Sequence, residues 1–339
     1  MRFIDTFKNY VRSQARHNVI LRKLLIWNRD RNSRAAQGGL ISKQPFGISN
    51  VELTNKCPMR CVMCPRTRNM TRAQGFMEFA VFKSIADQYA AANPAGAATD
   101  NFWLHHFGES LLHPELGKFI RYAVSRNVKA SLSVNPFLLS PEVSRDLLEA
   151  GIRVLYISLD GHDDASFERI RGVKNAFEPS KKNLLAFLKL KLELKSAARV
   201  SLSMIDFEEN QESIEVMRRF WAQVPGIDEF KCKTFVTWDG EAPDVNALAG
   251  TGRDSRESRK LHSAVGCLSP WRHMTVAWDG DVLPCCFDYD KKYVLGNVKE
   301  QSLAEIWNGE RMQSLRKEFL SNNVSNRLCR SCAELYPPL

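Results

Sequence analysis

Three cysteines, Cys57, Cys61 and Cys64, follow the short apolar run from Ile48 to Leu53 with the spacing C-x3-C-x2-C. Three thiolates in one tight loop are suited to binding a metal, because the thiolate is the form of cysteine that ligates metals. Structural zinc takes four closed ligands, and no fourth Cys or His lies in this loop, whereas an iron-sulfur cluster can leave one iron without a protein ligand. The spacing favours an iron-sulfur cluster and leaves zinc as the alternative.

Composition limits the class of protein. The chain has 339 residues and is 44% apolar, which suits one large globular domain with a smaller one. Nine cysteines without a secretory signal fit metal ligands in a reducing compartment, so we expect a cytoplasmic protein. No apolar run reaches the roughly eighteen residues of a membrane span. A formal charge of +10 favours an anionic partner such as a phosphorylated small molecule, an acidic peptide, nucleic acid or a lipid surface, although it can equally serve solubility.

The first 45 residues combine many Arg and Lys side chains with apolar residues at helical spacing. This pattern predicts a basic amphipathic helical segment. Such a segment either packs against the outside of the main domain or contacts a membrane surface or a partner. The sequence leaves both alternatives open.

From residue 46 to residue 237, short β-like runs alternate with amphipathic helical patterns. Strands are predicted at 48–53, 102–106, 130–134, 154–159, 200–204 and 229–236, and helices at 79–92, 114–125, 141–149, 182–192 and 210–222. Regular alternation of this kind predicts an α/β fold with a parallel sheet and helices outside it. The cysteine loop follows the first strand, at the carboxyl end where catalytic groups of such sheets lie.

A second group of cysteines lies in the C-terminal region, which we place at 267–339 after a linker at 238–266. It comprises Cys267, Cys285, Cys286, Cys329 and Cys332. Their spacing alone would permit a small zinc ribbon. The ninth cysteine, at position 232 inside the sixth predicted strand, is expected to be a small buried hydrophobe, as free cysteines usually are.

The cysteine loop resembles the signature of the radical S-adenosylmethionine (SAM) superfamily, and three further segments support the resemblance. His105-His106-Phe107-Gly108-Glu109-Ser110 is similar to the Gly-Gly-Glu turn of that family, and Asn135 stands where the family often has Thr-Asn-Gly. Ser158-Leu159-Asp160-Gly161, followed by Ile170-Arg171-Gly172, resembles its Ser-Leu-Asp-Gly and Ile-Arg-Gly motifs. The resemblance implies a partial (β/α)6 TIM-like barrel, a [4Fe-4S] cluster on Cys57, Cys61 and Cys64, and SAM.

The same resemblance implies roles for individual residues. Met63 stands where the family usually has an aromatic residue and would pack against the adenine. Gly108 and Glu109 would take up the SAM ammonium, and Asn135 would touch SAM or substrate. Ser158 and Asp160 would lie near the ribose, and Arg171 would face the SAM carboxylate. His105 and His106 are expected to be polar residues at a strand end, because a third metal ligand is absent from their neighbourhood.

The C-terminal cysteines resemble the SPASM/twitch extension of radical SAM enzymes. By that resemblance Cys267, Cys285, Cys329 and Cys332 hold an auxiliary [4Fe-4S] cluster, and Cys286 is the alternative to Cys285. The pattern is similar to that of the twitch-type aminocyclitol dehydrogenases. With all four irons capped by protein, the auxiliary cluster would pass an electron rather than bind substrate.

We therefore expect a radical SAM oxidoreductase that generates a 5'-deoxyadenosyl radical and converts an alcohol to a ketone in a small, sugar-like or anionic substrate. A reductase or a flavodoxin or ferredoxin would supply electrons. Alternatives are a maturase that modifies a ribosomally made peptide, a radical epimerase and, more remotely, a nucleic-acid-binding iron-sulfur protein. No nucleic-acid partner is expected, since basic charge is the sole feature favouring one. Candidates for the base that removes the hydroxyl proton are Lys231, Lys233, Asp239 and Arg153, among which the sequence does not choose.

Overall fold

The computed structural model describes residues 31–32, 35–97, 100–249, 267–332 and 335. Residues 1–30 and 33–34 of the predicted basic segment lie outside the described residues, as do residues 250–266 of the predicted linker. None of the helices in the described ranges combines the length and the apolar character that crossing a membrane requires.

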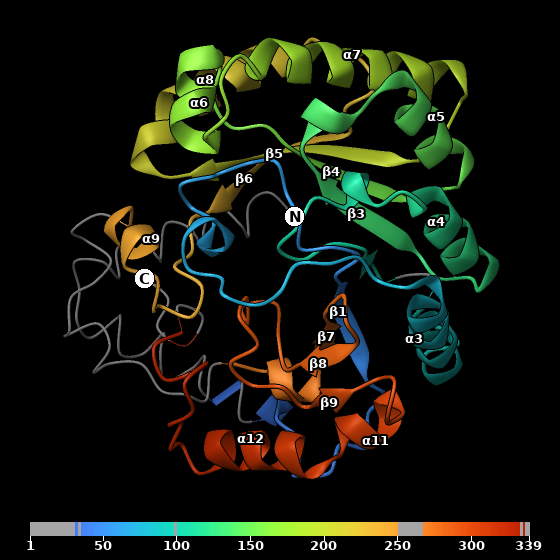
Figure 1. Cartoon of the computed structure of the whole chain (residues 1–339), viewed down its shortest axis with the longest axis vertical. Coiled ribbons are helices and arrows are strands. Elements are labelled where there is room, and N and C mark those ends of the chain that lie inside the picture. The colour runs from blue at the N-terminus through green and yellow to red at the C-terminus, as the bar shows by residue number, and fades with distance from the viewer. Residues whose placement is uncertain (1–30, 33–34, 98–99, 250–266, 333–334, 336–339) are drawn as a thin grey trace.

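Within these ranges, parallel strands alternate with helices as the sequence predicts (Figure 1). The elements are β1 (Gly47–Val51), α3 (Phe79–Ala92), β2 (Phe102–Trp103), α4 (Leu116–Ser125), β3 (Ala130–Val134), α5 (Pro141–Glu149), β4 (Val154–Ser158), α6 (Asp164–Arg171), α7 (Phe177–Glu193), β5 (Arg199–Asp206), α8 (Gln211–Trp221) and β6 (Glu229–Thr234). Strands β1 to β6 pair in sequence order, each parallel to the next. This sheet is the predicted partial barrel.

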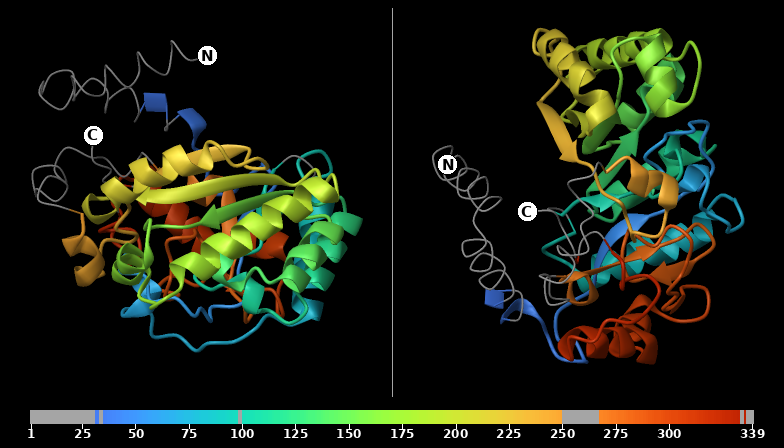
Figure 2. Two further views of the ribbon diagram at one scale, coloured as in Figure 1. Left: turned by 90° about the horizontal axis from the view of Figure 1, so that it is seen from above. Right: turned by 90° about the vertical axis from the view of Figure 1, so that its left-hand side faces the viewer.

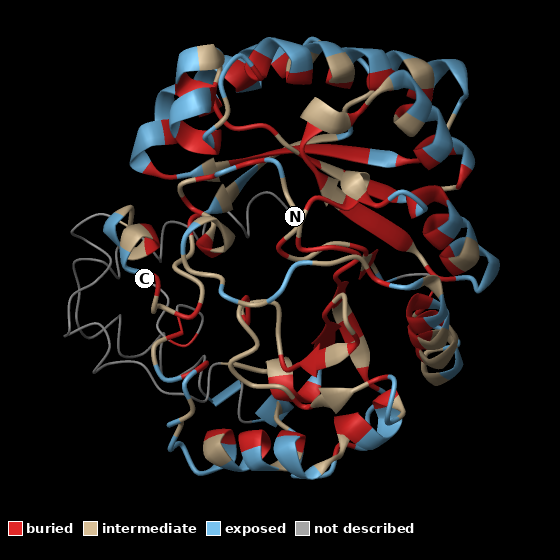
Figure 3. Ribbon diagram, in the orientation of Figure 1, coloured by how far each residue is buried: buried red, intermediate tan, exposed pale blue. Residues whose placement is uncertain are grey.

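The two faces of the barrel sheet differ in chemistry. Leu132 and Leu155, which are register partners on β3 and β4, are fully buried beneath the outer helices. The opposite, concave face carries polar residues such as Ser133 and its register partner Tyr156, both half-buried. Figure 3 shows the strands as mostly buried and the outward sides of the helices as exposed. Burial of the apolar face stabilises the sheet, and the concave face is left for polar contacts.

The C-terminal region continues the same sheet. Strand β7 (His273–Val276) pairs in parallel with β1, and β8 (Asp281–Leu283) and β9 (Gly296–Asn297) follow as antiparallel strands, giving the order β6-β5-β4-β3-β2-β1-β7-β8-β9. Two helices, α11 (Leu303–Trp307) and α12 (Glu310–Leu320), complete the region. In the right-hand view of Figure 2 they lie at the end of the molecule opposite α7 and α8. The region that carries the second group of cysteines therefore pairs, through β7, with β1, the strand that leads into the first cysteine loop.

The prediction for Cys232 is wrong. Its side chain is exposed, and its sulfur accepts a hydrogen bond of 3.1 Å from Nη2 of Arg218 on α8. The reason is that β6 forms the edge of the sheet and pairs with β5 alone. An edge strand of this kind leaves part of its outer face open to solvent, where a small apolar side chain is not covered.

Candidate active site

The first cysteine loop leaves the carboxyl end of β1 and is held by its own backbone. The amide of Cys64 donates to the carbonyl of Cys61 at 3.2 Å, and the amide of Thr67 donates to the carbonyl of Cys64 at 3.0 Å. The Thr67 hydroxyl also donates to the Cys61 carbonyl at 2.9 Å. These bonds use backbone and hydroxyl groups rather than thiols, and none of the three cysteines forms a disulfide.

The loop is also docked on the end of α6. The amide of Arg60 donates to the Arg171 carbonyl at 2.9 Å, and the amide of Val62 donates to the Ile170 carbonyl at 3.0 Å. Gly172, which ends α6 with a φ of 70°, lies so close that a Cβ would stand 2.6 Å from the Arg60 carbonyl oxygen. A glycine is needed here both for the left-handed backbone and for the close approach.

The thiols of this loop form a donor set that suits a highly charged metal group. Burial, aided by the Glu109 carboxylate, raises the pKa of Cys57 to about 12, and burial together with Cys61 raises the pKa of Cys64 to about 12. Crowded, desolvated thiols ionise when a cationic metal centre compensates their charge. Across the described part of the chain, no three His, Cys, Asp or Glu side chains converge tightly enough to hold a single metal ion.

The turn after β2 places Glu109 beside the loop. Its amide donates to the Lys56 carbonyl at 2.9 Å, and its carboxylate accepts from the amides of Leu111 and Asn135 at 3.1 and 2.7 Å. Glu109 is 3% exposed, and burial raises its pKa to about 7. A buried carboxylate without a basic side chain bonded to it is suited to receive a cationic ligand group, because the ligand's charge would offset the burial.

Asp160 and Arg171 form a buried ion pair on the other side of the loop. Nη2 of Arg171 lies 2.5 Å from Oδ2 of Asp160, and its Nη1 donates to the Cys61 sulfur at 3.5 Å. Oδ1 of Asp160 accepts from the Ile205 amide at 2.8 Å and from the Asn210 side chain at 2.7 Å. The pair holds the Arg171 guanidinium beside the Cys61 sulfur, so the protein itself supplies part of the positive charge that would compensate the cysteine thiolates.

The remaining predicted SAM contacts lie around these groups. The Asn135 side chain accepts from the Phe137 amide at 2.9 Å, and its Nδ2 has no hydrogen-bond partner among the described residues. The Ser158 hydroxyl lies 3.4 Å from that of Ser133 on the concave face. The Met63 side chain is buried, and its carbonyl accepts from the indole of Trp238 at 3.1 Å. Nε of Arg171 likewise has no partner in the described part of the chain, so buried polar atoms remain for a polar ligand.

The five thiols of the second cysteine group also lie together. Burial, followed by repulsion from Cys286, Cys329 and Cys332, raises the pKa of Cys285 well above its usual value. Burial, with Cys332 and Cys267 nearby, does the same to the pKa of Cys329. The structure thus brings together segments more than sixty residues apart in the sequence, and the donor set is again rich enough in thiols for a cluster.

A buried polar network links the end of β1 to the second cysteine group. Glu52, at the end of β1, forms a two-pronged ion pair with Arg72, with N–O distances of 2.6 and 2.5 Å. Nδ1 of His106 lies 3.4 Å from the Glu52 carboxylate, and its Nε2 lies 2.8 Å from the Cys286 carbonyl. Sequence reasoning missed Glu52 and Arg72, and treated His106 as a polar residue at a strand end. The available signal was a carboxylate between Val51 and Leu53, inside an apolar strand.

Aromatic side chains connect the turn after β2 with the second cysteine group. The ring of Trp238 lies 4.9 Å from that of Phe107, beside Gly108, and 5.4 Å from that of Phe287, beside Cys286. Asp239, the next residue, is fully buried and paired with Lys292 at 2.5 Å. The start of the predicted linker is therefore packed between the two cysteine groups.

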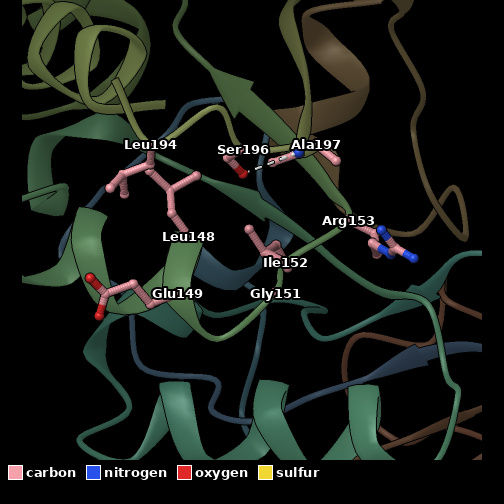
Figure 4. A pocket seen from close by; sticks show the side chains of 9 residues that line it. Leu148, Glu149, Gly151, Ile152, Arg153, Leu194, Ser196 and Ala197 are labelled. Atoms are coloured by element: carbon pink, nitrogen blue, oxygen red, sulfur yellow. Dashed lines mark hydrogen bonds between the residues drawn. The ribbon is translucent and has the colours of Figure 1, made fainter. Parts of the chain in front are cut away.

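A pocket of about 320 Å³ lies elsewhere, at the amino ends of β4 and β5 (Figure 4). Arg153, one of the candidate bases, lines it together with Gly151 and Ile152. Since Arg153 precedes β4, it lies at the end of the sheet opposite the cysteine loop. It is therefore not placed to act at the candidate site, which lies at the carboxyl ends of the strands.

Comparison with known proteins identifies the family. Residues 51–220 match the family described as "Radical SAM superfamily", and residues 267–333 match the family "SPASM", described as an iron-sulfur cluster-binding domain. The chain belongs to the radical SAM superfamily. It is a radical SAM enzyme that uses SAM and a [4Fe-4S] cluster, and its SPASM region binds auxiliary iron-sulfur clusters. The free thiols and the unpartnered atoms of Asn135 and Arg171 fit such groups.

Two curated proteins and one solved structure show how this radical SAM chain relates to others. It is 24% identical to a tungsten-containing aldehyde ferredoxin oxidoreductase cofactor-modifying protein of Pyrococcus furiosus, over 84% of this chain and 86% of the other. It is 22% identical to an S-adenosyl-L-methionine-dependent 2-deoxy-scyllo-inosamine dehydrogenase of Niallia circulans, over 85% and 92%. The crystal structure of BtrN in complex with AdoMet and 2-DOIA shares the fold, with a TM-score of 0.56 and 19% identity over 86% of this chain and 94% of that one.

Proposed function

We propose that this radical SAM enzyme is a dehydrogenase that oxidises an alcohol of a small molecule to a ketone. The observation that carries the proposal is the second thiol group, Cys267, Cys285, Cys329 and Cys332, whose four sulfurs would cap every iron of an auxiliary cluster. A cluster without an open iron is suited to accept an electron rather than to bind substrate. The relative named as a dehydrogenase, which the chain matches over 92% of its length, supports the same reading.

In this proposal the first site has an assigned task for each residue. Cys57, Cys61 and Cys64 would hold the SAM-binding cluster, Glu109 would take the SAM ammonium, and Arg171 would face its carboxylate. Gly108, Asn135, Ser158, Asp160 and Met63 would complete the SAM contacts. When bound, the cluster and SAM supply a radical that removes a hydrogen atom from the substrate.

The reaction balances as a loss of two hydrogens. The carbinol carbon would give up one hydrogen atom, its hydroxyl would give up one proton to a basic side chain, and the auxiliary cluster would take up one electron, which leaves the carbonyl. The Trp238 indole donates to the carbonyl of Met63, beside Cys64, and its ring packs against Phe287, beside Cys286, so one side chain contacts both cysteine segments. A reductase or a flavodoxin or ferredoxin would supply the electron that starts the cycle.

Our remaining assignments concern organisation and location. We propose a basic segment at 1–45, a barrel at 46–237, a linker at 238–266 and an auxiliary cluster domain at 267–339. None of the nine cysteines, all of which lie in the described ranges, forms a disulfide, which favours the reducing cytoplasm. Contact of the basic segment with a membrane surface remains a prediction, tested by salt-sensitive binding of the full chain to anionic vesicles.

Replacing Cys329 and Cys332 by alanine tests the electron-acceptor role. We expect the variant to go on cleaving SAM in part, because the first cysteine group is intact, while oxidised product falls strongly. Release of 5'-deoxyadenosine and formation of product would be measured side by side, with Cys232→Ala, at an exposed cysteine, as the control. Full product formation by the double variant would contradict the proposal.

A further inference from the structure

Two lysines of β6 point across the concave face of the barrel toward β4. Nζ of Lys231 lies 3.4 Å from the Tyr156 hydroxyl, and Nζ of Lys233 lies 4.9 Å from the centre of the Tyr156 ring. Between them, β5 presents Ser201 and Ser203, the register partners of Tyr156 and Lys231. Because these serines are small, both ammonium groups can reach over β5.

Neither lysine has a carboxylate within ion-pair distance among the residues that the structure describes. Other shielded lysines of the chain form ion pairs with carboxylates. Lys191 pairs with Asp228 at 2.7 Å, Lys291 pairs with Asp279 and Asp281, and Lys292 pairs with Asp239. A half-buried cation ordinarily needs a partner, since burial without one is costly. The two lysines of the concave face therefore leave positive charge unbalanced inside the barrel.

The surroundings of Lys233 add to this excess charge. Burial lowers the pKa of Lys233 to about 8; Asp160 opposes the change, while Arg171 and Lys231 reinforce it. His105 lies on the same side, and burial, with Lys233 nearby, lowers its pKa to about 3. Its Nδ1 is enclosed and has no hydrogen-bond partner in the described part of the chain. The ring of Trp103 stands beside both His105 and Tyr156, at 5.5 and 4.8 Å.

We propose that this face, made of Lys231, Lys233, His105 and Tyr156, binds an oxyanion, a phosphate or carboxylate, carried by the substrate. The inference rests on the proposed small-molecule substrate and names its chemical class. The ammonium groups would supply charge and the unpartnered His105 nitrogen a hydrogen bond, with Trp103 and Tyr156 forming a flat wall beside the ligand.

This arrangement disfavours a substrate that carries a protonated amine at the face. Such an amine would meet two like charges, and like charges in contact repel each other. An anionic substrate fits the face without that repulsion.

Chemical labelling of the intact enzyme tests the site without turnover. The anaerobically reconstituted protein, saturated with SAM, is treated briefly with acetic anhydride, with or without inorganic phosphate, and acetylation of each lysine is followed by peptide mass spectrometry. Phosphate at about ten times its Kd should slow labelling of Lys231 and Lys233 roughly tenfold, since protection grows as 1 + [L]/Kd. Lys181, half-buried beside Glu178 and Phe220 on the outer helices, is the control and should not change.

Parallel samples with succinate show which oxyanion the face prefers. Failure of both probes to protect, or equal protection at Lys181, would overturn the proposal. Protection that is seen in a parallel sample without SAM but not in the SAM-saturated protein would also overturn it, because the lysines would then belong to the SAM site. None of these outcomes depends on whether the reaction is an oxidation, so a failure here leaves the proposed dehydrogenase activity standing.

Variants and pH provide a second measurement by calorimetry. The double variant Lys231→Gln, Lys233→Gln should lose phosphate binding at least tenfold, whereas Lys181→Gln should retain it. Sulfate, whose charge is constant near neutrality, should bind with constant affinity below pH 8 and more weakly as the pH rises through about 8, where Lys233 loses its proton. The charged and titratable groups facing Lys233 are Lys231, Arg171, Asp160, His105 and Tyr156. A flat sulfate profile across this range would contradict a role for Lys233.

Discussion

Gly108 sets the distance between the turn after β2 and the cysteine loop. A Cβ at this position would lie 1.9 Å from the Thr54 carbonyl oxygen and 2.8 Å from the Asn55 Cα, both backbone atoms. A side chain would therefore push the turn, and Glu109 with it, away from the loop. The sequence resemblance predicts that Gly108 contacts SAM. The structure shows in addition that a glycine is needed here for the turn to pack against the backbone of Thr54 and Asn55.

Substituting Gly108→Ala should lower SAM affinity by tenfold or more and destabilise the fold, because the close approach is made between two stretches of backbone. Equilibrium binding of SAM to the reconstituted protein and its thermal midpoint would measure the two effects. Gly39→Ala is the matched control, since its Cβ would find the nearest atom 3.9 Å away. Normal SAM binding by the Gly108 variant would contradict this account.

Glu52 and Arg72 make a buried ion pair in the polar network that links the end of β1 to the second cysteine group. Glu52 is fully buried, and although burial alone would raise its pKa, the hydrogen bonds and charges of Arg72 and His106 hold that pKa well below the usual value of 4.5. Removing one partner of such a pair costs about 3–5 kcal/mol, because the other charge is left buried alone. Glu52→Gln should therefore lower the unfolding free energy by about that amount, measured by urea denaturation.

The double change Glu52→Gln with Arg72→Met should cost less than the sum of the single changes, since no unpaired charge remains. The pH dependence has a definite sign. The carboxylate stabilises the folded state above pH 4.5 and loses this effect as the pH falls below that value toward its depressed folded pKa. Glu52→Gln should be less acid-sensitive than the natural chain, and equal sensitivity would contradict the role of the pair.

At the scale of elements, helices with clear local signals were predicted to the residue. The predicted bounds of α3 and α5 coincide with Phe79–Ala92 and Pro141–Glu149. In α5, Ser140 caps the first turn and Pro141 follows it, which are local signals. Helix α6 was not predicted although Asp163 caps its start and Gly172 ends it, because only Phe167 and Ile170 among its eight residues are large apolar side chains. The pairing of β7 with β1 could not be predicted either, since it joins residues more than two hundred positions apart.

Pairing of β7 with β1 should make the two strands one cooperative unit. We expect hydrogen exchange, followed by mass spectrometry, to show that amides of 273–276 are protected as strongly as those of 47–51 and are lost together with them in mild denaturant. The short β9, which pairs with β8 alone, should exchange faster. Early, independent exchange of β7 would show that the C-terminal region is not part of the barrel sheet.

Iron content tests the separation of the two cysteine groups. The reconstituted protein should hold roughly eight irons and eight sulfides per chain, as two cubes require. Changing Cys57, Cys61 and Cys64 together to alanine should remove about half of the iron and all SAM cleavage, because the second thiol group lies on other elements. Cys232→Ala should alter neither. Full iron in the triple variant, or zinc in the natural protein, would contradict the ligand assignment.

At the scale of the whole molecule, one sheet carries both thiol groups and a cationic concave face. The cysteines and the motifs around them could be singled out as candidates from the sequence, because ligand spacing is local. It did not reveal the Glu52, Arg72 and His106 network or the grouping of Lys231 and Lys233 around Tyr156, because these contacts depend on how β1, β4 and β6 are arranged. The site's chemistry therefore follows from motif and topology together.

The central claim, oxidation with loss of two hydrogens, is tested most directly by product stoichiometry. The anaerobically reduced, reconstituted enzyme is incubated with SAM and a metabolite extract of its source cells, and 5'-deoxyadenosine is quantified against every metabolite that changes mass. We predict a small anionic metabolite that loses two hydrogens, in an amount equal to the 5'-deoxyadenosine released. A product of unchanged mass, with SAM regenerated, or a cross-linked peptide in place of a ketone would contradict the claim.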